Sequence, residues 1–284
     1  MLKVKSFAKL NLFLYVLSKR EDGYHEIFSL LNKIDLHDVL LFKKANRIIA
    51  NSNIEGLCGE ENIVYKVASF LKKRFDISEG IEIYVDKHIP VGSGLGGESS
   101  NAAYTLLTLN KIWHLKMSKE EMIKISLLWG SDIPFFISAN TALIKGRGEI
   151  IHPLRVKGKY FALIVFPEIL VLTKDVYSGK IQLTNKMFAH RISMNVFREN
   201  DINMRCISGY MHNDLEHSAF SLYPKLKQYK EKAEKQLGRN LIMSGSGSAF
   251  FTILFQDEEV QKAVNKCKML QKEGINCVKV KLLC

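Results

Sequence analysis

The chain has 284 residues, of which 47% are hydrophobic and 25% are charged, and its formal net charge is +12. This composition predicts a globular protein with one large core or two smaller ones and excludes a disordered chain. The positive charge would attract an anionic substrate, but the lysines are scattered and the longest basic cluster spans residues 72–74, so we expect no nucleic-acid partner.

The cysteines and the apolar runs indicate a protein of the cytoplasm. The five cysteines are odd in number, widely spread and without a C-x-x-C pair: Cys58, Cys206, Cys267, Cys277 and Cys284. Neither a disulfide framework nor a zinc site is therefore predicted, and a reducing cytoplasm fits. The apolar run over residues 161–172 contains Pro167 and Glu168 and is too short to cross a bilayer, so we expect no membrane partner.

The first predicted element is a strand over residues 9–16. Its apolar side chains alternate, and those that share one face are Leu10, Leu12, Leu14 and Val16. Lys9 and Asn11 project together from the other face, roughly 7 Å apart by strand rise. A lysine in a lysine-rich chain is usually a solvated charge, but an ammonium beside an amide in an apolar strand suits an anionic or hydroxyl-bearing substrate.

Asp22 and Gly23 predict a turn that folds a second strand back along the first. Tyr24 and His25 follow this turn and are candidates for a base pocket. A tyrosine ring can stack on a pyrimidine, and a histidine can bond the polar edge of the base. Either residue alone is more often partial core filler.

A helix is predicted over residues 63–71 and a strand over residues 81–86, followed by a loop with four glycines and three serines. A further helix begins near Ser99. Glycines let backbone amides approach a phosphate, and the helix start adds unpaired donors and a partial positive charge. The sequence therefore predicts a nucleotide phosphate site made of Pro90, Val91, Gly92, Ser93, Gly94, Leu95, Gly96, Gly97, Glu98, Ser99 and Ser100.

Two common phosphate-binding designs fit this loop poorly. A Walker loop is excluded because the segment contains no lysine. Gly92, Gly94 and Gly97 satisfy the dinucleotide pattern G-x-G-x-x-G, but a Rossmann unit needs a second parallel strand that ends in an acidic residue about twenty positions later. Residues 115–118 lead instead to another helix pattern. A dinucleotide-dependent enzyme is therefore the second candidate.

Asp132 follows that helix pattern and precedes Ile133 and Pro134. From local sequence it is either a catalytic acid or a turn aspartate that bonds nearby backbone. Ser118 and Glu121 have the spacing of a capping box, which we prefer to a metal-binding role for Glu121.

The pattern changes near residues 145–153, which predicts a first domain over residues 1–152 and a second over residues 153–284. Strands are predicted over residues 160–166, 241–243, 249–255 and 276–283, and helices over residues 224–237 and 258–271. The fold class is therefore α+β. Residues 244–248 read Ser-Gly-Ser-Gly-Ser, which fits a hairpin turn as well as a binding loop.

The glycine loop resembles that of the GHMP kinase superfamily, Pro-x-x-x-Gly-Leu-Gly-x-x-Ser-Ser. The matching positions are Pro90, Gly94, Leu95, Gly96, Ser99 and Ser100. The resemblance spans nearly the whole chain. Five further segments make it more specific, namely residues 8–12, 22–26, 130–136, 213–216 and 244–247. Glu98 departs from the family, which usually has a small residue there.

The resemblance implies a two-domain GHMP kinase fold. Its first half is similar to the second domain of a small-subunit ribosomal protein, and its second half to a ferredoxin-like domain. The implied activity is ATP-dependent phosphorylation of the 2-hydroxyl of a cytidine-diphosphate-linked 2-C-methyl-D-erythritol, in the non-mevalonate pathway to isoprenoid precursors. Mg²⁺ would accompany ATP without a dedicated protein metal site. The expected partner is this small polyol, and the expected state is a monomer or weak homodimer.

The resemblance also assigns site residues. Asp132 would hold and deprotonate the substrate hydroxyl, while Lys9 would stabilise charge and orient the aspartate. Tyr24 and His25 would contact cytidine, with Tyr177 stacking opposite. The implied substrate-binding set is Asn11, Tyr24, His25, Tyr177, Gly245 and Ser246.

Three alternatives stay open. The chain could be another GHMP small-molecule kinase, a dinucleotide-dependent oxidoreductase, or a non-catalytic RNA-binding protein with a ribosomal-type first half. Tight ATP binding without NAD binding separates the first from the second. RNA binding with steep salt dependence and no ADP release would support the third.

Overall fold

The computed structural model describes residues 1–197, 201–272 and 274–284. The chain forms two compact units, each assembled from separate stretches of sequence. Unit 1 comprises Met1–Ala8, Leu36–Ile89 and Gly96–Ala139. Unit 2 comprises Lys9–Asp35, Pro90–Leu95 and Asn140–Cys284. The first two strands, β1 (Leu2–Lys19) and β2 (His25–Ala45), therefore contribute residues to both units.

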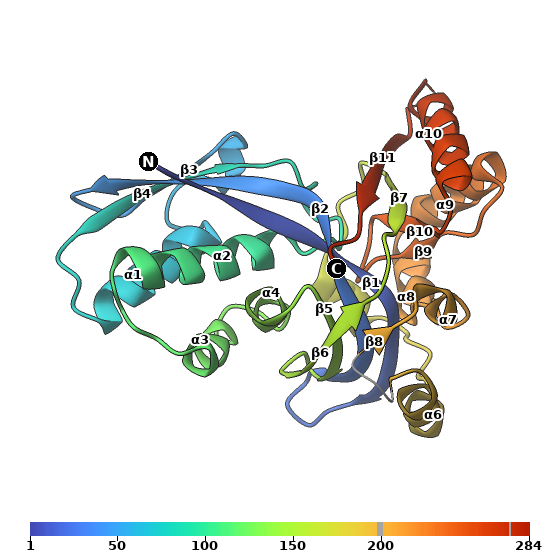
Figure 1. Cartoon of the computed structure of the whole chain (residues 1–284), viewed down its shortest axis with the longest axis horizontal. Helices are drawn as coiled ribbons and strands as arrows, with labels where there is room; N and C mark the ends of the chain where they lie inside the picture. The colour runs from blue at the N-terminus through green and yellow to red at the C-terminus, as the bar shows by residue number, and fades with distance from the viewer. Residues whose placement is uncertain (198–200, 273) are drawn as a thin grey trace. The chain divides into compact units, whose positions relative to one another are not determined.

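Unit 1 contains a group of paired strands and the helices η1 and α1 to α4 (Figure 1). Among these strands, β4 pairs in parallel with β3 and antiparallel with β2, where Val39 lies opposite Asp86. Its elements are β3 (Ile49–Ser52), the 3-10 helix η1 (Glu55–Leu57), α1 (Ile63–Arg74), β4 (Gly80–Asp86), α2 (Gly97–Ile112), α3 (Lys119–Ser126) and α4 (Ile133–Ser138).

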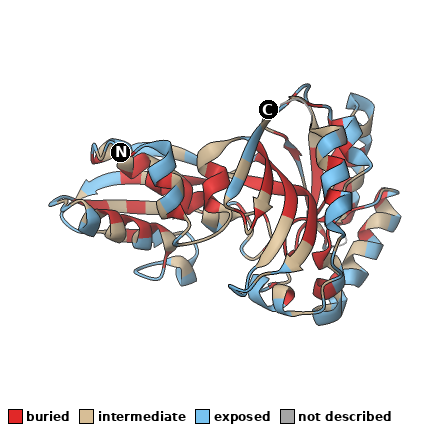
Figure 2. Ribbon diagram, turned by 90° about the horizontal axis from the view of Figure 1, so that it is seen from below, coloured by how far each residue is buried: buried red, intermediate tan, exposed pale blue. Residues whose placement is uncertain are grey.

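Alternation and helical periodicity build the core of unit 1. Ile81, Ile83 and Val85 are buried on one face of β4, while the residues between them are partly exposed. Helix α1 contacts β3, β4 and α2 and buries Val64, Val67, Ala68 and Leu71. This spacing places the four side chains on one stripe of the helix. The buried positions are red in Figure 2.

Unit 2 contains part of the seven-stranded sheet, from β2 through β8, and all of a four-stranded sheet. In the first, β2 pairs with β5 from Ile27 opposite Gly146 to Asn32 opposite Thr141, β5 pairs with β6, and β6 pairs with β8. The second sheet has the order β11-β7-β10-β9 and is antiparallel at each pairing. The strands are β5 (Thr141–Gly146), β6 (Ile150–Val156), β7 (Phe161–Phe166), β8 (Asp201–Ile202), β9 (Ile242–Met243), β10 (Phe250–Leu254) and β11 (Asn276–Lys281).

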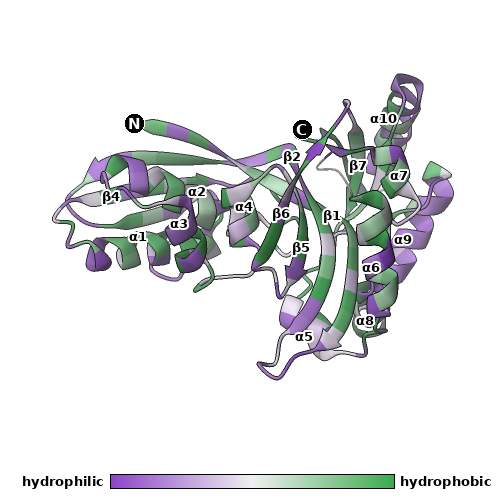
Figure 3. Cartoon of the chain, turned by 60° about the horizontal axis from the view of Figure 1, so that its bottom comes forward, coloured by the Kyte–Doolittle hydropathy of each residue, from purple (hydrophilic) through white to green (hydrophobic). Residues whose placement is uncertain are grey.

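Amphipathic helices complete unit 2. Helix α9 buries Leu226, Ala233 and Leu237 in a cluster with residues of β7 and β10, and Figure 3 shows the rest of this helix as largely hydrophilic. Pro224 begins the helix and Gly238, with a φ of +63°, ends it. The helices are α5 (Thr173–Ser178), α6 (Lys186–Val196), α7 (Met204–Ser208), α8 (Leu215–Leu222), α9 (Pro224–Leu237) and α10 (Asp257–Lys272).

The predicted α+β class is confirmed, and the strongly periodic elements lie where they were expected, α9 with identical bounds. After α2 the chain forms α3 and α4, where a Rossmann unit would place its second parallel strand. The proposed boundary between residues 152 and 153 stays a prediction.

The expectation about the cysteines was wrong in one respect, because Cys267 and Cys277 form a disulfide. Both are buried, and they lie on α10 and β11, which pack against each other. The two cysteines are ten positions apart in the sequence, and no C-x-x-C spacing signals such a pair. The expected cytoplasmic location stays a prediction. No helix among the described residues combines the length and the apolar character that spanning a membrane requires.

Candidate active site

In unit 2, the segment Pro90–Leu95, called here the 90–95 loop, is shaped by its glycines. Gly92 and Gly94 have φ values of +65° and +73°, which favour glycine. A Cβ on Gly94 would lie 2.0 Å from the carbonyl oxygen of Ser244, so a larger residue would collide with backbone. The Ser93 hydroxyl donates to the Pro90 carbonyl at 2.7 Å and closes the turn.

Residues 244–249, called here the 244–249 loop, pair with the 90–95 loop. The amides of Ser248 and Ala249 donate to the carbonyls of Gly92 and Ser93 at 3.2 and 3.0 Å. The Ser244 hydroxyl donates to the Gly94 carbonyl at 3.1 Å. The Ser-Gly-Ser-Gly-Ser segment is thus a turn whose backbone supports the predicted phosphate loop.

Lys9 and Asn11 lie beside these two loops on β1. Lys9 is 2% exposed, its amide donates to the Leu95 carbonyl at 2.9 Å, and its ammonium donates to the Asn11 side-chain oxygen. The Asn11 amide nitrogen Nδ2 donates to the Ser29 hydroxyl at 3.0 Å. A Cβ on Gly245 would lie 3.1 Å from Lys9 Nζ. The expected common face of Lys9 and Asn11 is confirmed, and Gly245 lies next to both.

The remaining residues of the glycine segment begin α2 in unit 1. Gly96 is the N-cap with a φ of +73°, and among the described residues no side chain caps the helix there. The first amides of α2 are therefore oriented as an anion-binding helix start. Glu98 is exposed. Ser100 is fully buried and donates to the Phe7 carbonyl at 2.6 Å, so its hydroxyl anchors the helix.

A buried ion pair supports the same helix start. Asp38 and Lys87 pair with side-chain exposures of 0% and 3%. Asp38 also accepts hydrogen bonds from the amides of His88 and Ile89, both at 2.8 Å, and from Asn101 Nδ2 at 3.0 Å. One carboxylate thus holds the chain just before Pro90 and the first turn of α2. Sequence reasoning missed it, because a lone aspartate and a lone lysine 49 positions apart carry no local signal.

Asp132 lies at the N-cap of α4 in unit 1 and is partly buried. Within the part of the chain that the structure describes, the Asp132 side chain does not cap α4. Asp132 is therefore not a helix-capping aspartate. Glu121 does take the structural role expected of it. Its carboxylate accepts from the Ser118 amide at 2.8 Å, and its own amide donates to the Ser118 hydroxyl at 3.1 Å.

The predicted base-binding residues form two ring contacts in unit 2. The His25 and Tyr177 rings lie 5.4 Å apart, and the Arg147 guanidinium lies 4.9 Å from the centre of the Tyr24 ring. Tyr24 remains 51% exposed. Burial, with a smaller contribution from Lys19, lowers the pKa of His25 below 6.5. Arg147 was not among the predicted site residues, since one arginine after a glycine carries no distinctive pattern.

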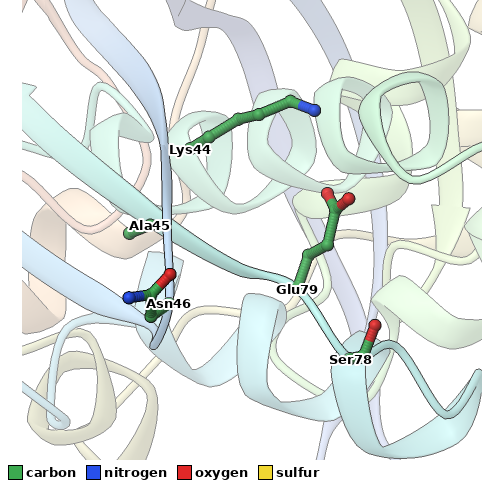
Figure 4. A pocket seen from close by; sticks show the side chains of 5 residues that line it. All are labelled: Lys44, Ala45, Asn46, Ser78 and Glu79. Carbon is green, nitrogen blue, oxygen red and sulfur yellow. The ribbon is translucent and has the colours of Figure 1, made fainter.

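A different hollow lies on unit 1 and does not involve the predicted residues. It has a volume of about 540 Å³ and is lined by Lys44, Ala45, Asn46, Ser78 and Glu79 (Figure 4). Its lining offers no glycine-rich backbone for a phosphate. Among the described residues, no three or more His, Cys, Asp or Glu side chains gather in a way that could hold a metal ion.

Comparisons with known proteins cover most of the chain. Residues 62–140 match the model of the GHMP kinases N terminal domain, and residues 197–269 match that of the GHMP kinases C terminal domain. A 4-diphosphocytidyl-2-C-methyl-D-erythritol kinase of Thermodesulfovibrio yellowstonii is 36% identical over 272 residues, 93% of each chain. The enzyme of that name from Thermoanaerobacter pseudethanolicus is 38% identical over 94% of this chain and 92% of its own length.

The comparison with solved structures finds an enzyme of the same kind. A crystal structure of 4-(cytidine 5'-diphospho)-2C-methyl-D-erythritol kinase superposes with a TM-score of 0.78 and 28% identity, covering 99% of both chains.

Proposed function

Because the chain belongs to the family of 4-diphosphocytidyl-2-C-methyl-D-erythritol kinases, we propose that it transfers the γ-phosphoryl group of ATP to the 2-hydroxyl of that polyol. This is a step of the non-mevalonate pathway to isoprenoid precursors. The observation that carries the proposal is identity of 36% and 38% to such enzymes over more than nine tenths of this chain. These identities are measured over the motifs and the residues between them, so the similarity is not limited to the motifs.

The glycine segment is the proposed ATP site. Gly92, Gly94 and Gly96 have positive φ values, a conformation that favours glycine and lets backbone approach a phosphate, and the start of α2 adds the positive end of a helix dipole. Mg²⁺ is usually held by phosphate oxygens, water and one or two carboxylates. We therefore propose that Mg²⁺ enters with ATP, bound mainly through its phosphates, and that it screens the triphosphate charge.

Asp132 and Lys9 are the proposed catalytic residues. The 2-hydroxyl oxygen forms a bond to the γ-phosphorus, the bond between that phosphorus and the bridging oxygen breaks, and ADP leaves with the electron pair. The hydroxyl proton passes to the Asp132 carboxylate late in the reaction, when a loose transition state has made the hydroxyl acidic. The Lys9 ammonium stabilises the charge on the phosphoryl oxygens.

Cytidine recognition is assigned to Tyr24, His25 and Tyr177. An exposed tyrosine ring braced by a guanidinium offers one free face to a pyrimidine. Because burial keeps His25 neutral near pH 7, its imidazole can both donate to and accept from the polar edge of the base. Asn11, Gly245 and Ser246 complete the proposed substrate-binding set, and a monomer or weak homodimer stays a prediction.

Substrate choice can be tested with a coupled assay of ADP release. The cytidine-linked methylerythritol is compared with mevalonate, homoserine and galactose at matched concentrations. We expect selective turnover of the cytidine-linked substrate. Turnover of another alcohol in its place would indicate a different kinase of the same superfamily.

A further inference from the structure

Asn213 is a buried amide whose side chain forms hydrogen bonds with backbone groups. It is 3% exposed, and its Nδ2 donates to the carbonyls of Met243 and Gly245, both at 2.7 Å. Its Oδ1 accepts from the Leu215 amide at 2.9 Å. The two carbonyls stand on either side of Ser244, so one side chain spans the start of the 244–249 loop.

The carbonyls that Asn213 holds flank the residue that contacts the proposed catalytic strand. The Ser244 hydroxyl accepts from the backbone amide of Asn11 at 3.3 Å and donates to the Gly94 carbonyl at 3.1 Å. A Cβ on Gly245 would lie 3.1 Å from Lys9 Nζ. A shift of residues 243–245 would therefore move the surroundings of Lys9 and of the 90–95 loop together.

The segment that carries Asn213 is itself fixed to β1. The Leu14 amide donates to the His212 carbonyl at 2.8 Å, and the Asp214 amide donates to the Leu14 carbonyl at 3.0 Å. Glu216 accepts from the Met243 amide at 2.8 Å and pairs with Lys230 at 2.7 Å. The segment is thus tied to the strand that bears Lys9 and, at the same time, to the 244–249 loop.

We propose that Asn213 is a positioning residue, which holds the 244–249 loop so that Lys9 and the 90–95 loop keep the geometry needed for phosphoryl transfer. The proposal rests on the proposed kinase function. Asn213 acts through backbone and contacts no reacting atom. A purely structural role would lower stability without a selective effect on the two loops.

The test compares Asn213→Asp with Asn32→Asp. Asn32 is also fully buried, and its Nδ2 also donates to backbone, namely the carbonyls of Lys33, Asn140 and Leu283. Both substitutions remove an amide donor at almost constant volume and place an oxygen against carbonyl oxygens. Only Asn213→Asp changes a residue bonded to the 244–249 loop.

Two readouts are expected to separate the variants. Turnover of Asn213→Asp falls on the order of 10²-fold, because a displacement of about 1 Å in a reacting group costs that much. Burial raises the pKa of the introduced carboxyl, and its protonated form can donate one of the lost hydrogen bonds. The ratio of variant to wild-type turnover therefore rises as pH falls. Asn32→Asp keeps turnover within a few-fold at every pH.

Amide hydrogen exchange tests the positioning role without any substrate. The Ser248 and Ala249 amides, which bond the 90–95 loop, should exchange faster in Asn213→Asp than in Asn32→Asp. A wild-type protein that fails to phosphorylate the cytidine-linked polyol would overturn the proposed function, whereas this exchange result would still decide the role of Asn213. If Asn213→Asp does not fold, Asn213→Ser removes the same donors without adding charge. Equal exchange in these two amides, or equal turnover in the two variants, overturns the proposal.

Discussion

At the scale of single residues, the predicted chemistry depends on contacts that the local sequence does not contain. Lys9 could be singled out because it interrupts an apolar strand next to Asn11. Its burial could not be predicted, because the 90–95 and 244–249 loops that cover it are distant in sequence. Asp38 was missed for the same reason, and Asn213 was noted only as part of the motif at residues 213–216, without a role.

Asp132 is expected to matter for chemistry and little for nucleotide binding. Asp132→Ala removes the proposed proton acceptor, so turnover should fall by about 10²- to 10⁴-fold. The affinity for ATP, measured by calorimetry, should stay within a few-fold. Near-wild-type turnover would refute the assignment of the base.

Protonation of His25 should make the KM for the cytidine-linked substrate depend on pH in one direction. Because burial lowers the pKa of His25 from the ordinary 6.5, the neutral ring predominates above pH 6.5, and the protonated ring is populated as pH falls further. The KM for the cytidine-linked substrate should stay constant above about pH 6.5 and rise as pH falls further. In His25→Gln this rise should disappear, and a rise of equal size in that variant would exclude His25 as its origin.

At the scale of elements, periodicity and capping residues were the reliable signals. Helices α1 and α9 and strand β4 were predicted because each has one buried face, and Ser118 and Glu121 mark the start of α3. The short helices α4 to α8 were not predicted. They have at most eleven residues each, and their positions are set by packing more than by propensity.

The capping box offers a prediction about α3. Ser118→Ala removes the acceptor for the Glu121 amide and should lower the free energy of unfolding by about 1 kcal/mol. Glu121→Gln keeps the reciprocal bond and should leave both stability and the Mg²⁺ dependence of turnover unchanged. Urea denaturation and a Mg²⁺ titration are the measurements. A changed Mg²⁺ dependence would reopen a metal-binding role for Glu121.

A substitution at the connection from β4 to α2 should lower the free energy of unfolding far more. Asp38→Asn leaves the Lys87 ammonium buried without its counter-ion, which should cost about 3–5 kcal/mol of unfolding free energy. The exposed pair of Arg20 and Asp22 is the matched control, and Asp22→Asn should have little effect. Similar urea midpoints for the two variants would contradict this account of the buried pair.

At the scale of the whole molecule, the fold class and the superfamily could be predicted from the sequence, since the glycine loop and five further motifs occur in a fixed order. It could not show how each compact unit is assembled from separate stretches of chain, or that Cys267 would meet Cys277. The first depends on pairing between distant residues and the second on how α10 packs against β11, and periodicity carries no information about either.

The net charge of +12 predicts a salt effect on substrate capture. Long-range attraction of an anionic substrate is screened as the Debye length falls from about 30 Å at 0.01 M salt to about 10 Å at 0.1 M. The kcat/KM for the cytidine-linked substrate should therefore fall over this range, while kcat stays nearly constant. A kcat/KM that does not depend on salt would mean that the charge plays no part in capture.

Phosphorylation of the oxygen on carbon 2 of the polyol can be observed by ³¹P NMR of the reaction product. Carbon 2 carries the methyl group and no hydrogen, so a phosphate on its oxygen has no three-bond coupling to a proton. We predict a new phosphomonoester signal that stays a singlet without proton decoupling, formed together with ADP. A new signal split by protons, or no new signal when the protein, ATP, Mg²⁺ and substrate are combined, would contradict the account.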